Sequence, residues 1–130
     1  MYNFLDIAKL LISNGADVNA KTSKYGHPPL LVALQLNCLE IAELLLSSGA
    51  DIDAKCINGY SGLHFAVGRR SLDQAKFLVS HHIDMDAKDE NGRTALDYAY
   101  MGNLQEMILY LEQKYQRSHP SDYILYVFEF

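Results

Sequence analysis

The chain has 130 residues, of which 49% are apolar and 21% charged, close to the averages of globular domains. Sixteen acidic residues against eleven basic ones give a net charge of -5, which disfavours nucleic-acid binding, because that depends on clustered Lys and Arg. No apolar run reaches the roughly 20 residues of a membrane-spanning helix, and no basic segment precedes the first apolar run as in an export signal. Cys38 and Cys56 are too few for a disulfide framework, so we expect reduced thiols and an intracellular, cytoplasmic location.

The chain repeats itself. "LLISNGADVNAK" at residues 10–21 returns as "LLLSSGADIDAK" at 44–55 and, less closely, as "FLVSHHIDMDAK" at 77–88. Between these copies lie "GHPPLLVALQL", "GYSGLHFAVGRR" and "GRTALDYAYMG", which begin 33 residues apart at Gly26, Gly59 and Gly92. A fixed period of this length indicates stacked repeats that share one continuous core.

Each period predicts two helices followed by a hairpin. The first copy begins at Asn3 with a second helix, which contains "LDIAKLLI" at residues 5–12, and its own first helix is absent. The blocks that begin at the three glycines place Leu and Ala three residues apart, which predicts short first helices with a narrow buried face. "LEIAELLL", "LDQAKFLV" and "LQEMILYL" follow as second helices, and the "AD" and "ID" segments lead into hairpins. We expect a core that contains Leu30, Ala33, Leu45, Leu63, Ala66 and Leu78.

Local residues mark the ends of the second helices. Ser71 with Gln74 and Asn103 with Glu106 have the spacing of a capping box at the start of a second helix. Asn37 with Glu40 has the same spacing one position earlier in its repeat. Gly15 and Gly49 can close these helices in the left-handed conformation, and His82 stands at the third such position. The pattern therefore predicts a left-handed residue at His82.

The 33-residue period, the "GADVNAK" and "GADIDAK" hairpins, and "SGLHFA" and "TALDYA" at the first helices resemble the ankyrin-repeat family. The resemblance covers residues 3 to about 112 and implies an all-α solenoid of stacked helix-turn-helix units with protruding hairpins. We expect an ankyrin-repeat domain at 1–112, with an N-terminal half-repeat at 3–21 and repeats at about 22–55, 56–88 and 89–112. An apolar tail at 113–130 falls outside the period.

Several segments depart from the family pattern. The interval from Lys21 to Gly26 is one residue longer than its counterpart, which predicts a larger hairpin tip. "PPLL" at residues 28–31 lacks the Thr and His of the family signature, so we expect the first full repeat to be locally looser. The interval from Ala99 to Leu104 is one residue shorter than in the preceding repeat. Only Ser61 and His64 preserve a hydrogen-bonded pair like that of the family signature. In the tail, Pro120 should end any helix, and "YILYVF" either folds back over the stack or is docked by another protein.

The sequence offers little for catalysis or metal binding. "SHHIDMD" brings together His81, His82, Asp84 and Asp86, but the aspartates occupy recurring hairpin positions and the spacing does not match zinc sites. Cys38 should lie partly buried at a second-helix start, Cys56 in a hairpin arm, and His64 at the head of a helix as a structural residue. No phosphate loop or catalytic constellation is visible. We expect no enzyme activity, no metal and no cofactor.

The resemblance implies that asparaginyl hydroxylases could modify Asn19, although hydrogen bonding of its side chain within the hairpin is the simpler interpretation. It also implies a partner protein, bound along one concave surface by hairpin tips and the ends of first helices. The candidate positions are Lys24, Tyr25, His27, Gln35, Leu36, Ile57, Asn58, Tyr60, Arg69, Glu90, Asn91, Arg93 and Met101.

Other interpretations remain open. In a second interpretation, the chain is a spacer or a piece of a larger ankyrin protein. In a third, it is an adaptor or effector whose tail recruits a second partner. Around the first helix, we expect those of Tyr2, Phe4, Ile7 and Leu10 that face away from the stack to be exposed, or covered by a second copy in self-association. Tyr60 and Ile57 could also serve only to cover neighbouring hairpins.

Overall fold

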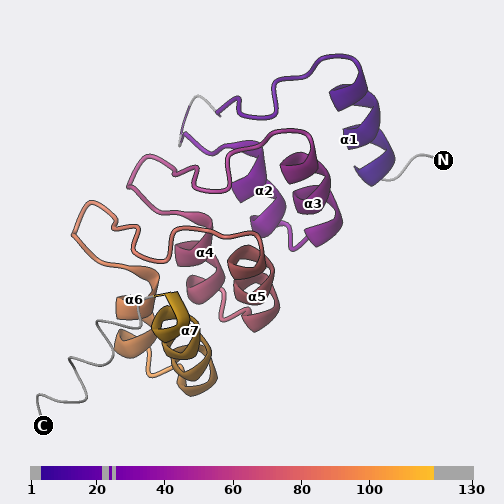
Figure 1. Ribbon diagram of the computed structural model, residues 1–130. Coiled ribbons are helices and arrows are strands. Elements are labelled where there is room, and N and C mark those ends of the chain that lie inside the picture. The colour runs from indigo at the N-terminus through magenta and orange to yellow at the C-terminus, as the bar shows by residue number, and fades with distance from the viewer. Residues whose placement is uncertain (1–3, 22–23, 25, 119–130) are drawn as a thin grey trace, which may run out of the picture.

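The computed structural model describes residues 4–21, 24 and 26–118. These residues form helices joined by turns and hairpins (Figure 1), with bounds α1 Phe4–Ser13, α2 Pro29–Gln35, α3 Leu39–Ser47, α4 Gly62–Gly68, α5 Leu72–Ser80, α6 Ala95–Met101 and α7 Gln105–Ser118. Within the described ranges no strand occurs, and one antiparallel bridge joins Lys55 to Ser61. The predicted all-α repeat fold is confirmed.

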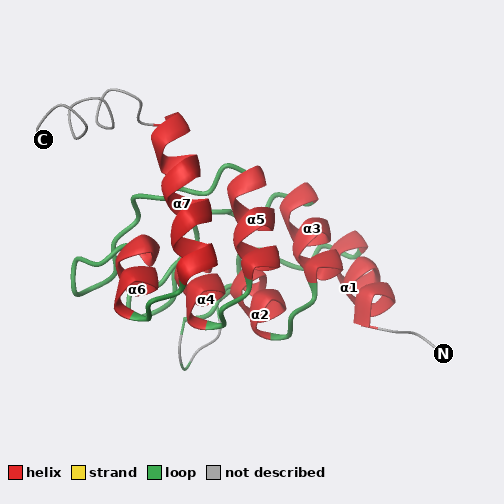
Figure 2. Cartoon of the chain, turned by 90° about the horizontal axis from the view of Figure 1, so that it is seen from below, coloured by secondary structure: helices red, strands yellow, loops and turns green. Residues whose placement is uncertain are grey.

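The helices form two rows. The first helices of the repeats, α2, α4 and α6, lie side by side in one row, and α1, α3, α5 and α7 lie in the other, as both views show (Figures 1 and 2). The connecting hairpins project beyond the row of first helices, and α1 and α7 lie at opposite ends of the stack (Figure 1). Within residues 4–118, as far as the structure describes them, the row of first helices begins at α2.

The core follows the repeated Leu and Ala positions. Leu30 and Ala33 of α2 pack with Ala42 and Leu45 of α3 in one cluster, and Leu63 lies in a second cluster that runs through the later repeats. All six predicted core residues are buried. Small residues on the inner face let the short first helices approach their neighbours closely, as at Gly62, where an added Cβ would lie 3.1 Å from Leu34 Cδ1.

A left-handed residue separates the two helices of each repeat. Asn37, Arg70 and Asn103 have φ values of 54°, 57° and 53°. Asn37 and Asn103 therefore occupy the turn instead of capping the following helix, and the N-cap of α3 is Cys38, which is half-buried as expected. The capping predictions at Asn37 and Asn103 are wrong, because asparagine tolerates the left-handed conformation that this tight turn needs.

The turn also fixes the register of the last repeat. The backbone N–H of Ser71 donates to the Ala66 carbonyl at 2.9 Å, and that of Leu104 donates to the Ala99 carbonyl at 3.0 Å. Leu104 is thus the counterpart of Ser71, and α7 begins at Gln105, 33 residues after Leu72 begins α5. The predicted shortening between Ala99 and Leu104 is wrong, because a leucine occupies the position that precedes the helix.

The ends of the second helices agree with the sequence. Gly15 and Gly49 have φ values of 90° and 99°, and His82 has a φ of 64°, as predicted. At the C-terminus, α7 continues past residue 112 to Ser118, so the proposed division at 112 falls inside a helix. The "YILYVF" segment lies outside the described residues, as does much of the enlarged first hairpin tip.

Candidate functional site

A groove opens between the first helices of the second and third full repeats. It has a volume of about 410 Å³ and is lined by residues of α4, α6 and the adjoining turns, namely Tyr60, His64, Phe65, Val67, Gly68, Arg69, Arg70, Tyr98, Gly102 and Leu104. Gly68 and Gly102 bring no side chain into this space. Its lining is therefore mainly aromatic and aliphatic, with Arg69 and Arg70 contributing where α4 ends.

The aromatic wall is one packed cluster. The Tyr60 ring lies 6.4 Å from Phe65 and 6.3 Å from Tyr98, measured between ring centroids, and both contacts are edge-to-face. Tyr60 is half-buried and packs against the main core. These contacts fix the ring positions before any partner arrives, which lowers the entropy cost of binding.

His64 anchors the head of α4 beneath this cluster. The Ser61 backbone N–H donates to His64 Nδ1 at 3.1 Å, so Nδ1 is the unprotonated nitrogen, and Nε2 donates to the Arg93 carbonyl at 2.9 Å. The side chain is buried and joins one repeat to the hairpin of the next. The prediction that His64 is structural and pairs with Ser61 is confirmed.

Asp89 stabilises the hairpin that leads into α6. Its carboxylate accepts a hydrogen bond from the Tyr98 hydroxyl and from the backbone N–H groups of Asn91 and Arg93, at 2.9 and 3.0 Å. These bonds, that from Tyr98 above all, lower the pKa of the Asp89 carboxyl, and the same contact raises the pKa of Tyr98. The Arg93 guanidinium lies 6.0 Å from the Tyr98 ring centroid.

Basic groups stand at the rim of the groove. Arg69 and Arg70 are exposed, and Arg69 Nη1 donates to the Gln35 carbonyl of the preceding repeat at 2.9 Å. This bond directs the Arg69 side chain along the row of first helices. Among the described residues, neither arginine forms a salt bridge, so the rim carries positive charge although the chain as a whole is acidic.

The predicted binding residues fall into three groups. Exposed positions are Lys24, Leu36, Ile57, Asn58, Arg69, Glu90, Asn91, Arg93 and Met101, whereas His27, Gln35 and Tyr60 are half-buried and Tyr25 lies outside the described residues. Leu36 and Met101, near the C-terminal ends of α2 and α6, are 67% and 63% exposed. Of the whole set, Tyr60 and Arg69 line the groove.

Successive hairpins touch one another. The Glu90 backbone N–H donates to the Asn58 carbonyl at 3.1 Å, and a Cβ added to Gly59 would lie 3.1 Å from Asp89 Cα. Gly59 has a φ of 79°, so the close approach and the backbone conformation both require glycine here. The tips at Asn58 and Glu90 are thus held side by side.

Asn19 is tied to the next hairpin. Its side-chain oxygen accepts from the Asp51 N–H at 2.9 Å and its amide donates to the Gly49 carbonyl at 3.3 Å, while Asp53 accepts from the Asp84 N–H at 2.8 Å. The expected bonds within the hairpin are therefore bonds between repeats. Hydroxylation of Asn19 stays a prediction.

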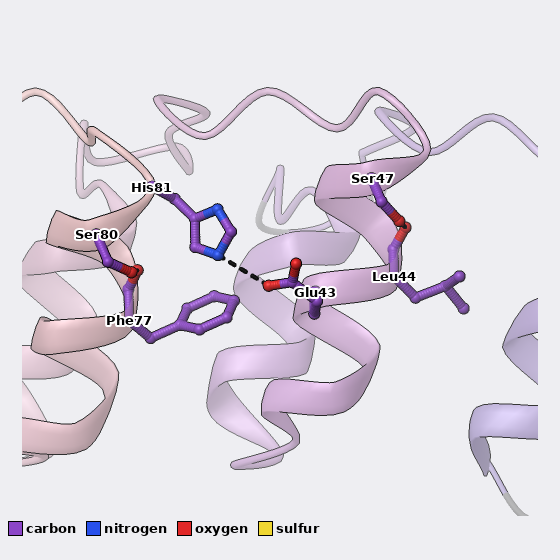
Figure 3. Close-up of polar contacts among 6 residues, drawn as sticks. All are labelled: Glu43, Leu44, Ser47, Phe77, Ser80 and His81. Carbon is purple, nitrogen blue, oxygen red and sulfur yellow. Dashed lines mark hydrogen bonds and ion pairs between the residues drawn. The ribbon is translucent and has the colours of Figure 1, made fainter.

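The histidine-rich segment is used for packing. His81 Nε2 lies 2.8 Å from Glu43 Oε2, and the His81 ring lies against that of Phe77 in a tilted arrangement, so the contact joins α3 to the C-terminal end of α5 (Figure 3). The hydroxyls of Ser47 and Ser80 donate hydrogen bonds to the backbone carbonyls of Leu44 and Phe77, each within its own helix. Within the described part of the chain, no group of three His, Cys, Asp or Glu side chains has the arrangement of a metal site.

Gln74 is a residue whose role sequence reasoning missed. The Ser71 hydroxyl accepts from the Gln74 N–H at 3.2 Å, which is half of the expected capping box. The fully buried Gln74 amide instead crosses to the preceding repeat, where it donates to the Leu34 carbonyl and to Asn37 Oδ1 at 2.8 and 3.0 Å. Ile41 and Met107 occupy the equivalent positions of the other repeats. A polar residue at a repeat position that is otherwise apolar is therefore the one feature of the sequence that could have indicated this contact between repeats.

Comparisons with known proteins agree with the geometry. The family model for ankyrin repeats, which comprises three copies, matches residues 1–56 and 49–121. No curated protein matches the chain. No helix in the described ranges is long and apolar enough to cross a bilayer. Ankyrin repeats are generally protein-protein interaction modules and are typically non-enzymatic. The match and the two-row stack together place this chain in the ankyrin-repeat family.

Proposed function

We propose that the chain binds another protein through its hairpin tips and the exposed side of its first helices, with the groove between α4 and α6 at the centre. The groove is the observation that carries this proposal, because it joins preorganised aromatic rings to exposed arginines. Tyr and Arg are the residue types most enriched in the energetically dominant parts of interfaces. The neighbouring exposed Leu36 and Met101 would extend the contact along the row.

The proposal is tested on a partner captured from cell extract with the full chain. Arg69→Ala and Met101→Ala should each weaken binding of that partner by about 1 to 2 kcal/mol, roughly fivefold to thirtyfold, with little change in melting temperature because both side chains are exposed. Leu109→Ala is the matched control, since Leu109 is equally exposed but lies on α7, in the other row. If the wild type and all three variants bind the partner with equal affinity, this surface is excluded as the binding site.

Substitution of Tyr60 is a less suitable test of partner binding than its position in the repeat indicates. Its half-buried ring packs against the core as well as against Tyr98, so Tyr60→Ala should reduce stability and binding together. A loss of affinity in that variant alone would not separate the two causes. Arg69 and Met101 therefore carry the test.

Self-association through the N-terminal edge is a second candidate. Ile7 and Leu10 are exposed on α1, as predicted, whereas Tyr2 and the Phe4 side chain lie outside the described residues. A sedimentation experiment on the wild type and on Leu10→Glu tests this, and a monomer at all accessible concentrations would exclude it. The spacer and tail-recruitment alternatives are tested by repeating the capture with residues 1–118, because loss of partners would favour recruitment by the tail.

Within this proposal, binding takes place inside the cell, in the cytoplasm. The support for it is that Cys38 and Cys56 are the only cysteines, too few for the disulfide framework of a small secreted domain. Fractionation of cells that express the full chain tests the location, and recovery from the medium would contradict it.

A further inference from the structure

The groove between α4 and α6 differs in chemistry from one end to the other. Tyr60 and Phe65 line it near the start and middle of α4, where the Tyr60 ring contacts both Phe65 and Tyr98. Arg69 and Arg70 line it where α4 ends. Phe65 and Arg69 are four residues apart, which corresponds to about 6 Å along a helix axis. An occupant therefore meets an aromatic surface and basic side chains at this separation.

The charged side chains that line the groove are all basic. Arg69 and Arg70 are exposed, and no Asp or Glu is among the described residues that line it. Asp89 lies outside the lining, and its carboxylate accepts a hydrogen bond from the Tyr98 hydroxyl and two from backbone N–H groups. Glu106 lines a neighbouring pocket that also contains Arg70, but the two form no salt bridge in the described part of the chain. The groove is therefore complementary to a negatively charged occupant.

Arg70 is the exception at its position in the repeat. It follows a first helix in the left-handed conformation, with a φ of 57°, where the other two repeats have Asn37 and Asn103 at 54° and 53°. Asparagine adopts this conformation more readily than arginine does, so the turn itself does not call for arginine. Whereas Arg69 donates to the Gln35 carbonyl, the Arg70 guanidinium makes no hydrogen bond to the described residues. Arg70 is thus the cation that is available to an occupant.

The size of the groove decides between a helix and an extended segment as the occupant. Two turns of helix, about 10 Å across, fill on the order of 800 Å³, twice the groove volume of about 410 Å³. An extended segment rises about 3.3 Å per residue and directs alternate side chains to the same face. Two residues of such a segment span the separation between Phe65 and Arg69, with both side chains facing the groove.

We infer that this groove takes a short extended segment of the partner protein, in which an apolar side chain packs on the rings of Tyr60, Phe65 and Tyr98 and a carboxylate two residues away pairs with Arg70. The inference rests on the proposed function, because it names the chemistry that the groove selects. The C-terminal ends of α4 and α6 disfavour an anion, but the full charge of a guanidinium outweighs their partial charges of about half a unit.

The probe is a library of random linear peptides, selected on the immobilised full chain. The most enriched peptide is synthesised with its Asp or Glu and, separately, with the matching Asn or Gln. Fluorescence anisotropy then measures the affinity of both forms for the wild type, Arg70→Asn, Glu106→Gln and Arg117→Gln. Arg70→Asn gives this turn the residue of the other two repeats, so the fold should be retained. Arg117 is the matched control, because it is exposed on α7 and does not line the groove.

We expect the selected peptides to carry an acidic residue two positions from an apolar one. Arg70→Asn should weaken binding of the acidic form by about threefold to fivefold at low salt, the range of an exposed ion pair, and should leave the amide form unchanged. Glu106→Gln should strengthen binding of the acidic form slightly, and Arg117→Gln should change neither. The melting temperature of Arg70→Asn should equal or exceed that of the wild type.

Two outcomes would overturn the inference and leave the proposed function intact. One is a set of peptides that compete with the captured partner but lack the acidic residue, and the other is an equal loss of both peptide forms on Arg70→Asn. Failure to enrich any peptide that competes with the partner would overturn it as well, while the partner's own response to Arg69→Ala and Met101→Ala still decides the proposed function. A wild-type dimer that becomes a monomer as Arg70→Asn would also contradict it, because a second copy would then be the occupant.

Discussion

The N-terminal edge and the middle of the stack use the same sequence pattern with different results. α1 and α3 share their leucine and alanine positions, yet Leu45 is buried and Leu11 is not. α3 packs against α2, its own first helix, and also against α1, whereas among the described residues no such first helix lies beside α1. Burial in this fold therefore depends on neighbours more than on the local sequence, as expected for a repeat stack.

The largest effect should separate Leu45→Ala from Leu11→Ala. Leu45→Ala should lower the free energy of unfolding by about 2 to 5 kcal/mol, because it opens a cavity in the cluster with Leu30 and Ala42. Leu11→Ala should cost about 1 kcal/mol or less, because the side chain is already half exposed. Urea denaturation measures both, and equal costs would show that the two positions are equivalent after all.

A smaller effect concerns the hairpin between the second and third full repeats. The pKa of Asp89 lies below its ordinary value of 3.8, chiefly because the Tyr98 hydroxyl donates to it. A depressed folded-state pKa contributes stability that is present above the unfolded value and lost as pH falls through the folded one. The stability difference between wild type and Asp89→Asn should therefore be full at neutral pH and shrink below pH 3.8.

Urea denaturation at a series of pH values measures this difference. Tyr98→Phe is the control that removes the principal cause of the shift while leaving the carboxyl in place. A difference that stays constant from neutral pH to well below the ordinary pKa would contradict the assigned role of the carboxylate.

The smallest expected effect is that of chelation. The core leucines and the bonds between hairpins hold the repeats together, and His81 pairs with Glu43. The melting temperature should be the same with and without EDTA, and zinc should not raise it. A shift of several degrees in either experiment would show that the "SHHIDMD" segment binds metal.

Much of the fold was predictable because it is periodic. The leucines and alanines keep their interval, so one repeat predicts the next, and His82 could be placed in the left-handed conformation from Gly15 and Gly49 alone. Reliance on the apolar pattern also led to a wrong prediction for the start of α7, which begins at Gln105. Leu104 continues the apolar pattern one position early, and the hydrogen bond of the turn, not apolarity, decides where the helix begins.

The candidate sites were less predictable. Exposure of Leu36, Ile57 and Met101 follows from their places in the repeat, but the groove is lined jointly by residues of two repeats, Gly68 and Gly102 among them. Gln74 bridges to the preceding repeat in a way that no other repeat shares. Such contacts are set by pairs of residues far apart in the chain, and a single sequence carries no record of the pairing.

Hydrogen exchange tests most directly the claim that neighbours determine local stability. The amides of Ala8–Ile12 in α1 and Ala42–Leu46 in α3 belong to matching sequences, so their intrinsic rates are similar and their protection can be compared position by position. In dilute solution, α1 should exchange faster by about tenfold or more, because it is stabilised from one side only. Equal protection of the two helices would contradict the account.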